Sequence, residues 1–460
     1  MPSGEDEKHA EPAVNAPPGL VPFGEAARVW GRVAAQSFGG PAGQIAVMHR
    51  IVVEEKRWVS EERFLHALSY CMLLPGPEAQ QLAIYLGWLL HRAPGGLVAG
   101  TFFVLPGMVA MLLLSFLYVF YRETWLLAGI FYGLQPAVMA VVVEAVVRIG
   151  RKALLRPWHL ATAALAFAGI FFFDLPFPAI IAAAAVAGLV AGRFVPAVAA
   201  APPPAAAERV ADAAALRLKP TLTRSAWVLG VGLLLWACPP LLLLAAFGRD
   251  HVLLDQAVFF SQAAVVTFGG AYSVLAYIGQ EAVGTFHWLE PREMLDGLGL
   301  AETTPGPLIM VVQFVAFLGA YRHPGTLAPT TAAVLGSLVT TWVTFVPSFL
   351  WIFLGAPYIE ALRENRTLRD ALSGITAAVV GVILNLALFF SLHTLFAEVR
   401  PLRLGLLHLQ APTWSSLDPA LLAIAVFAFL ALFRFKLGMG KTLAASSLAG
   451  LLIYLAPLLF

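Results

Sequence analysis

The chain has 460 residues, of which 60% are hydrophobic and only 12% charged, and its mean hydropathy is +0.81. Soluble domains carry roughly 25% charged residues, so this composition excludes an ordinary soluble globule and predicts an all-α polytopic membrane protein. The net charge of +2 gives no basic footprint for nucleic acid. Two cysteines, Cys71 and Cys238, lie far apart in apolar surroundings, which argues against a disulfide or a cysteine metal site.

The chain begins with a polar tail. Residues 1–22 are rich in Pro and Ala and include acidic residues such as Glu5 and Glu11. They lack the basic and apolar regions of a signal peptide. We therefore expect residues 1–22 to form a disordered cytosolic tail.

The first unit, residues 23–194, starts with two pairs of half-length apolar helices. Each pair is interrupted by glycine and proline, at residues 39–41 and at residues 75–77. Full spans are predicted near residues 95–121, 126–149, 158–173 and 177–193, because about 20 helical residues cross a bilayer. A Pro- and Ala-rich cytosolic linker, residues 195–224, follows, and then one extra transmembrane helix, residues 225–247.

The second unit, residues 248–460, repeats the first in the same order. Its Thr267-Phe-Gly-Gly run and its Pro305-Gly-Pro run each stand 230 residues after Ser37-Phe-Gly-Gly and Pro75-Gly-Pro. Trp58 and Trp288 keep the same offset, and about eight residues are inserted later. A match without gaps over this length indicates a duplication.

The extra helix predicts that the two units have opposite orientations. If each broken pair crosses the membrane once, each unit has six spans and the total is about 13 transmembrane segments. If each pair is a re-entrant hairpin, each unit has four crossings. Both numbers are even, so one added helix inverts the second unit in either case.

Charges in the loops set the expected orientation. The inner loops of a topology with the N-terminus inside hold 15 Lys and Arg residues, and the outer loops hold seven, including Lys56, Arg57 and Arg122. Because Lys and Arg accumulate on the cytoplasmic side, we expect a cytoplasmic N-terminus and a periplasmic or outside C-terminus in a bacterial inner membrane.

The four breaks predict a site for an anion. Helix N-termini offer unpaired N–H groups and a positive dipole end, glycine permits close approach, and inverted repeats would aim these ends at one point. The alternative is that the breaks are packing kinks. The candidate substrate-binding residues are Ser37, Gly39, Gly40, Pro41, Gln44, Pro75, Gly76, Pro77, Gln80, Thr267, Gly269, Gly270, Thr303, Thr304, Pro305, Gly306 and Pro307.

Two groups of these polar residues have structural alternatives. The hydroxyls of Ser37 and Thr267 either donate to an oxyanion or bond back to their own helix. The amides of Gln44, Gln80, Gln313 and Asn385 either contact the anion or hold helices together.

Charged residues in apolar helices are functional candidates because burying a charge in the membrane is costly. Arginines would attract a dianion, or else extend to the interface. Glu78 follows the first Pro-Gly-Pro and suits either a proton-coupling group that is neutral when the anion binds or a structural carboxylate at a helix start. The candidates for charge or coupling roles are Arg32, His49, Arg50, Arg63, His66, Glu78, Asp296, Glu302 and Asn385.

The motifs resemble those of the chromate ion transporter family, in its long-chain, two-domain bacterial form. The resemblance is carried by Ser37-Phe-Gly-Gly-Pro-Ala-Gly-Gln, Cys71-Met-Leu-Leu-Pro-Gly-Pro-Glu-Ala-Gln-Gln, Thr267-Phe-Gly-Gly-Ala-Tyr, Asp296-Gly-Leu-Gly-Leu-Ala-Glu-Thr-Thr-Pro-Gly-Pro and Gly374–Asn385. It implies export of chromate, a divalent tetrahedral oxyanion, with resistance to chromate as the result.

With the export direction taken from the resemblance, we expect a secondary transporter that works by alternating access and is driven by the membrane potential. Proton antiport would add to this drive but is not required. The alternative is a transporter or channel for another oxyanion such as sulfate. We expect no enzyme, because neither a hydrolase triad nor a phosphate-binding loop is evident, and two isolated cysteines do not make the redox site that a chromate reductase needs. The expected partners are the oxyanion and the lipid bilayer, with a homodimer as one possibility and no cofactor or metal.

Overall fold

The computed structural model describes residues 21–38, 40–194, 221–268, 270–358, 365–405 and 407–459. Nearly all of the predicted tail and linker, together with Gly39 and Gly269, lie outside these ranges. The described chain is helical apart from one β-hairpin, and seven of its helices are long and apolar enough to cross a membrane. The prediction of an all-α polytopic membrane protein is confirmed.

The first unit runs from α1 to α7. Its elements are α1 (Phe23–Gln36), α2 (Gly40–Met48), the π-helical turn η1 (His49–Glu55), α3 (Glu61–Cys71), α4 (Glu78–Tyr121), α5 (Trp125–Ala153), α6 (Pro157–Phe173) and α7 (Phe177–Phe194). α4 contains two antiparallel helices, because the backbone leaves helical geometry at His91 and Arg92. The two arms pack so closely that a Cβ on Gly87 would lie 2.4 Å from the carbonyl oxygen of Gly95.

The second unit follows the extra helix α9 (Leu222–Phe247) in the same order. Its helical elements are α10 (Val252–Val266), α11 (Ala271–Gln280), η2 (Glu281–Thr285), α12 (Pro291–Thr303), η3 (Leu308–Met310), α13 (Val311–Arg322), α14 (Pro329–Gly355), η4 (Ala356–Tyr358), α16 (Arg366–Leu395), η5 (Trp414–Ser416), α17 (Pro419–Phe429), η6 (Leu430–Arg434) and α18 (Met439–Leu459).

A β-hairpin stands between α16 and α17, where the first unit has only a short turn. Its strands, β1 (Val399–Leu404) and β2 (Leu407–Pro412), pair antiparallel with Val399 opposite Pro412. The alternation of apolar and polar residues around Gly405 is typical of such a hairpin. This hairpin was not among the predicted elements.

Both broken pairs of the first unit are re-entrant hairpins whose ends lie on one side of the molecule. Lys56, after the second arm of the first pair, forms a 2.8 Å ion pair with Glu25 at the start of the first arm. His91, at the end of the second pair, bonds to the carbonyl of Val21 at 2.8 Å. We call this side, which carries the Glu25–Lys56 pair, the proximal side.

The broken pairs of the second unit are also re-entrant hairpins, and they open to the opposite side. Arg322, which ends the second pair, bonds to Glu293 at 2.8 Å and to the carbonyl of Trp288 at 3.1 Å. Glu293 also contacts Arg122, beyond the far end of α4, at 3.0 Å. We call this side, which carries the Glu293–Arg322 pair, the distal side.

The re-entrant hairpins show which of the 13 predicted segments are placed to cross the membrane and which enter and return. Within the described ranges, nine helices are placed to cross: the seven long ones, taking α4 after its kink, and the shorter apolar α6 and α17. Four broken pairs enter and return. Lys56 and Arg57 were assigned to an outer loop, and this was wrong: the Glu25–Lys56 ion pair keeps them on the same side as the start of α1.

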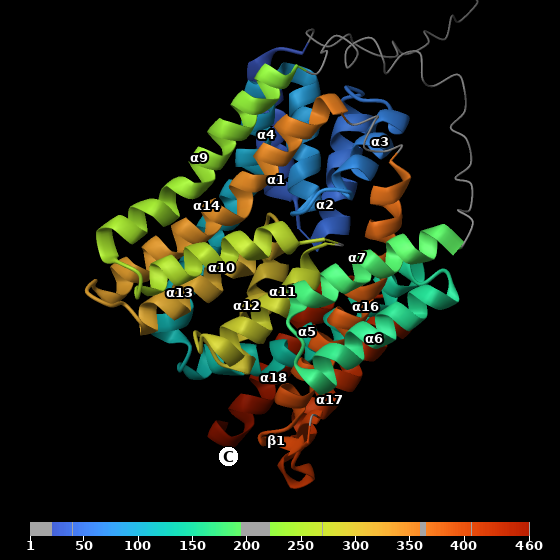
Figure 1. Cartoon of the computed structure of the whole chain (residues 1–460). Helices are drawn as coiled ribbons and strands as arrows, with labels where there is room; N and C mark the ends of the chain where they lie inside the picture. The colour runs from blue at the N-terminus through green and yellow to red at the C-terminus, as the bar shows by residue number, and fades with distance from the viewer. Residues whose placement is uncertain are drawn as a thin grey trace, which may run out of the picture.

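The two units exchange their crossing helices. α5 of the first unit packs against α17 and α18 of the second, and α16 of the second unit packs against α6 and α7 of the first (Figure 1). Glycines permit this close approach: a Cβ on Gly133 would lie 2.0 Å from the carbonyl oxygen of Ser446, and one on Gly374 would lie 2.1 Å from that of Ala184. Small residues at such contacts are typical of membrane helices.

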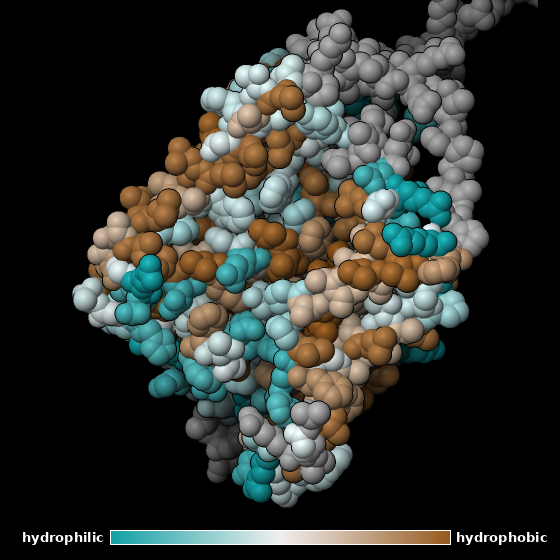
Figure 2. Space-filling model, viewed as in Figure 1, coloured by the Kyte–Doolittle hydropathy of each residue, from teal (hydrophilic) through white to brown (hydrophobic). Residues whose placement is uncertain are grey.

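The surface agrees with a membrane environment. The extra helix α9 lies at the edge of the molecule, and large apolar side chains such as Trp227, Leu234 and Leu242 are exposed on it. Figure 2 shows an apolar surface over the upper left of the molecule, in the region of α9 and α14, and more hydrophilic residues toward the lower end. The first unit's hairpins are at the top of Figure 1 and the C-terminus at the bottom.

Candidate functional site

The breaks of the two units are hydrogen-bonded to each other. The backbone N–H of Gly76 donates to the carbonyl oxygen of Thr267 at 2.8 Å, and the N–H of Gly306 donates to that of Ser37 at 2.9 Å. Each Pro-Gly-Pro turn thus meets the Phe-Gly-Gly break of the other unit. This reciprocity is what a two-fold relation between the units produces.

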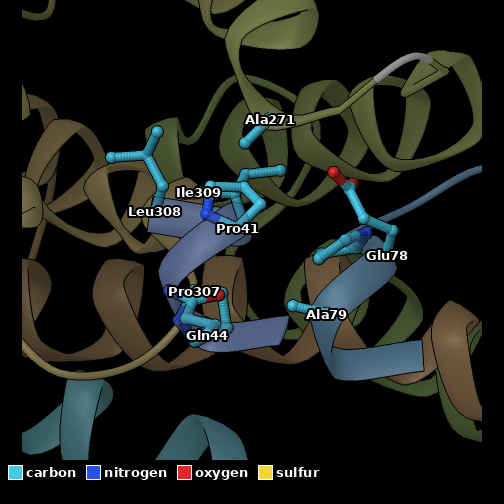
Figure 3. Close-up of a pocket in the computed structure, with 9 residues that line it drawn as sticks. Pro41, Gln44, Glu78, Ala79, Ala271, Pro307, Leu308 and Ile309 are labelled. Carbon is cyan, nitrogen blue, oxygen red and sulfur yellow. The ribbon is translucent and has the colours of Figure 1, made fainter. Parts of the chain in front are cut away.

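A small cavity lies where the four breaks meet. It is lined by the first residues of α2, α4, α11 and η3 (Figure 3). Its volume is about 10 Å³, roughly the space for one water molecule, so a tetrahedral oxyanion does not fit without rearrangement. The lining residues are Pro41, Gln44, Pro77, Glu78, Ala79, Ala271, Pro307, Leu308 and Ile309.

The local conformation of the breaks requires glycine. The φ angles of the described break glycines are all positive, at +69° for Gly40, +126° for Gly76, +96° for Gly270 and +99° for Gly306. This region is costly for residues with a Cβ. Each glycine stands between the end of one helix and the start of the next, within the protein interior, where the first N–H groups of the new helix have no intrahelical acceptor.

The hydroxyls beside the breaks donate to their own helices in this structure. Ser37 Oγ donates to the carbonyl of Val33 at 2.7 Å, and Thr267 Oγ1 to that of Ala263 at 2.6 Å. Thr303 and Thr304 also donate to carbonyls three residues earlier. The structural alternative therefore describes their present bonding, and contact with an anion would require these hydroxyls to rotate.

The amides divide into two kinds. Gln313 joins helices, since its amide nitrogen donates to the carbonyl of Met108 at 3.0 Å. Gln44 lines the cavity and donates to the carbonyl of Gly306, while its own Oε1 is buried without a hydrogen-bond partner. Gln80 is fully buried and neither of its polar side-chain atoms has a partner. A buried amide without partners is costly, so Gln44 and Gln80 are suited to gaining contacts when the site changes shape.

Two carboxylates approach the helix starts that follow the Phe-Gly-Gly breaks, each from the other unit. Glu78 lines the cavity, and its Oε1 lies 3.3 Å from where a Cβ on Gly270 would stand, at the start of α11. Glu302 Oε2 lies 3.8 Å from the corresponding point on Gly40, at the start of α2. Glu302 also accepts a hydrogen bond from Tyr272.

The remaining charged candidates do not line the cavity. Arg32 pairs with Glu55 at 2.7 Å and Arg50 donates to Gln36 at 2.7 Å. His49 contacts Glu54 and Glu61 toward the proximal side, and Arg63 and His66 lie on α3.

Asp296 and Asn385 also stand apart from the cavity. Asp296 is fully buried and accepts hydrogen bonds from Tyr118 at 2.7 Å and from Gln135 at 2.8 Å. It therefore links the second unit to α4 and α5 of the first. Asn385 lines a separate groove of about 580 Å³ beneath the β-hairpin.

Several residues at or near the site were not predicted. Ala79 and Ala271 line the cavity. Ala271 directly follows Gly270 and Ala79 stands two residues after Pro77, so a small side chain beside a break is the signal that was available. Tyr272, Tyr118 and Gln135 gave no such signal, because they contact Glu302 and Asp296 only after the chain has folded. Among the described residues no group of three or more His, Cys, Asp or Glu side chains is placed to hold a metal.

A family model and two curated relatives indicate the family of this chain. The family model described as chromate transporter matches residues 24–189 and 254–453. A chromate transport protein of Pseudomonas aeruginosa is 34% identical over 356 residues, 75% of this chain and 76% of that protein. One from Cupriavidus metallidurans is 27% identical over 93% of this chain and 92% of its own length. An uncharacterized transporter of Methanocaldococcus jannaschii is 24% identical over 77% of this chain and 81% of its own length. No solved structure matches significantly.

Proposed function

The chain belongs to the chromate transporter family, and we propose that it is a secondary transporter that exports chromate across the bacterial inner membrane. The observation that carries this proposal is the meeting of four helix starts at one buried cavity between two units that open to opposite sides. Helix starts present N–H groups and a positive dipole end, which suit a dianion that loses its water. The two chromate transport proteins that match most of this chain support chromate as the substrate.

The way in which the hairpins are held supports a proposal of alternating access. The first unit's hairpins open to the proximal side and the second unit's to the distal side, and they touch through the Gly76–Thr267 and Gly306–Ser37 bonds. The cavity between them is too small for chromate. We propose that the hairpins separate on one side at a time, while the exchanged helices α5 and α16 hold the two units together.

The membrane potential can drive export, with the proximal side as the cytoplasm. Moving one charge is worth about 2.3 kcal/mol per 100 mV, so a dianion leaving a negative interior gains about 4.6 kcal/mol. At about 1.4 kcal/mol per tenfold ratio, this supports a gradient on the order of 10³. An accompanying proton would add to this driving force in antiport and subtract from it in cotransport.

The test is chromate uptake by the purified chain in proteoliposomes under an imposed potential. We expect chromate to accumulate in vesicles whose interior is positive, and to do so more as the potential increases. Uptake that ignores both the potential and a pH gradient would remove the energetic argument. Unlabelled sulfate is added as a competitor: backbone N–H groups respond to charge and shape, so we expect competition, and transport of sulfate without chromate would favour the other-oxyanion alternative.

A further inference from the structure

Glu302 is a buried carboxylate with one unsatisfied oxygen that points at a helix start. Glu302 is 6% exposed, and its Oε1 accepts a hydrogen bond from the hydroxyl of Tyr272. Oε2 is buried without a hydrogen-bond partner and is the atom that approaches Gly40, where α2 begins. A buried charge with an unpaired oxygen is costly, and the positive end of α2 is the compensation nearest to it.

The position of Glu302 is equivalent in function, though not in sequence, to that of Glu78. The 230-residue offset places Glu302 opposite Met72 and Glu78 opposite Leu308. Even so, each carboxylate reaches the helix start after the Phe-Gly-Gly break of the other unit. The two differ in their surroundings, since Glu78 is half-buried and lines the cavity while Glu302 is sealed from solvent.

An oxyanion at the start of α2 would compete with the charged form of Glu302 for the same dipole. Two unit charges of like sign 4 Å apart repel by about 4 kcal/mol in surroundings of intermediate polarity. Protonation of Glu302 removes that repulsion, and the neutral acid can still accept the Tyr272 hydrogen bond. Binding of the proton and of the oxyanion are therefore mutually favourable.

From this arrangement, and resting on the proposed function, we propose that Glu302 carries one proton together with each oxyanion, so that the protein is a proton–oxyanion cotransporter. A proton from the side on which the oxyanion enters binds the Glu302 carboxylate, and it leaves to the other side after the oxyanion departs. No bond other than O–H forms or breaks. Each cycle moves a net charge of −1 instead of −2, so export remains driven by the potential, although less steeply.

The other titratable groups around Glu302 leave it as the group that changes charge. Tyr272, on α11, holds its proton and donates it to Glu302 in a hydrogen bond. On α5, Glu144 and Arg148 form an ion pair at 3.7 Å and largely cancel each other. Glu78, at the start of α4, lines the cavity, which Glu302 does not.

The test uses the whole chain in proteoliposomes with no membrane potential and a pH gradient of one unit, at pH values where chromate is the dianion. Cotransport of one proton concentrates chromate about tenfold in the alkaline compartment, because one pH unit is a tenfold ratio of protons. Antiport would concentrate it in the acidic compartment, and either that result or no accumulation would overturn the proposal. Absence of chromate transport under any gradient would instead overturn the proposed function.

The variant Glu302→Gln tests whether Glu302 is the residue that carries the cotransported proton. We expect this variant to carry chromate without accumulation in a pH gradient, and to raise the accumulation per 100 mV from about 50-fold to about 10³-fold, as the charge moved changes from −1 to −2. The matched control is Glu281→Gln, at the first residue of η2 directly after α11, which should keep the tenfold response. Tyr272→Phe, which retains Glu302, should keep the tenfold response while its rate optimum moves to higher pH. Unchanged pH coupling in Glu302→Gln would exclude this residue.

Discussion

The backbone N–H of Gly76 donates to the carbonyl oxygen of Thr267 at 2.8 Å, which fastens a turn of the first unit to a break of the second. Its counterpart, from Gly306 to Ser37, measures 2.9 Å. These two bonds join the hairpins that must move apart to admit a substrate. Neither bond uses a side chain, so the contact depends on backbone shape and therefore on glycine.

The re-entrant hairpins predict which loops are reached from which side. With the exposed Cys238 replaced by Ser, a cysteine at Arg57 should react with an impermeant thiol reagent from the cytoplasmic side, and one at Arg400 only from the outside. A cytosol-only reporter fused after the last residue should be inactive. Reaction of both cysteines from the same side would contradict the hairpin arrangement.

Glu293 should be important for stability, because it joins the units on the distal side. It is 2% exposed and contacts Arg322 at 2.8 Å and Arg122 at 3.0 Å. Glu293→Gln leaves two arginines without their carboxylate, and we expect it to lower the free energy of unfolding by about 1–3 kcal/mol.

Thermal unfolding in detergent measures this effect. The matched control is Glu398→Gln, which breaks an exposed ion pair with Arg400 and should cost about 0–1 kcal/mol. Equal effects of the two substitutions would show that the buried network does not hold the units together.

Gly133 should tolerate no larger side chain. A Cβ there would lie 2.0 Å from the carbonyl oxygen of Ser446, on the helix that the second unit packs against α5. Gly133→Val must push α5 and α18 apart, at a cost of about 1–3 kcal/mol or more. We expect a lower yield of folded protein by size-exclusion chromatography. Gly230→Val, on α9 where a Cβ meets nothing within 4 Å, should behave as wild type.

Much of the fold could be predicted from the sequence because duplication supplies an internal comparison. The 230-residue offset located the four breaks, and an odd number of linking helices indicated inversion. The sequence did not indicate whether each broken pair crosses the membrane or returns to the same side. That is set by contacts across the hairpin, such as Lys56 with Glu25 and Arg322 with Glu293, which form only in the folded chain.

The candidate site was predictable in its backbone and less so in its side chains. Three break prolines, Pro41, Pro77 and Pro307, line the cavity, and the N–H groups of Gly76 and Gly306 bond to the breaks of the other unit. Arg32 and Arg50 were candidates to attract a dianion, yet Arg32 forms an ion pair with Glu55 and Arg50 donates a hydrogen bond to Gln36. The approach of Glu302 to Gly40 has no counterpart at the equivalent position of the first unit, so the repeat itself could not indicate it.

The central claim is that the glycine breaks form the transport site, and chromate export by Gly76→Leu and Gly306→Leu tests it most directly. A side chain at Gly76 would meet Gln81 at 2.7 Å, and one at Gly306 would meet the backbone of Gly107 at 3.2 Å, both with positive φ. With expression and folding verified, and with Gly230→Leu as the control, we predict that both variants lose export while the control retains it. Unchanged export in both folded variants would contradict the account.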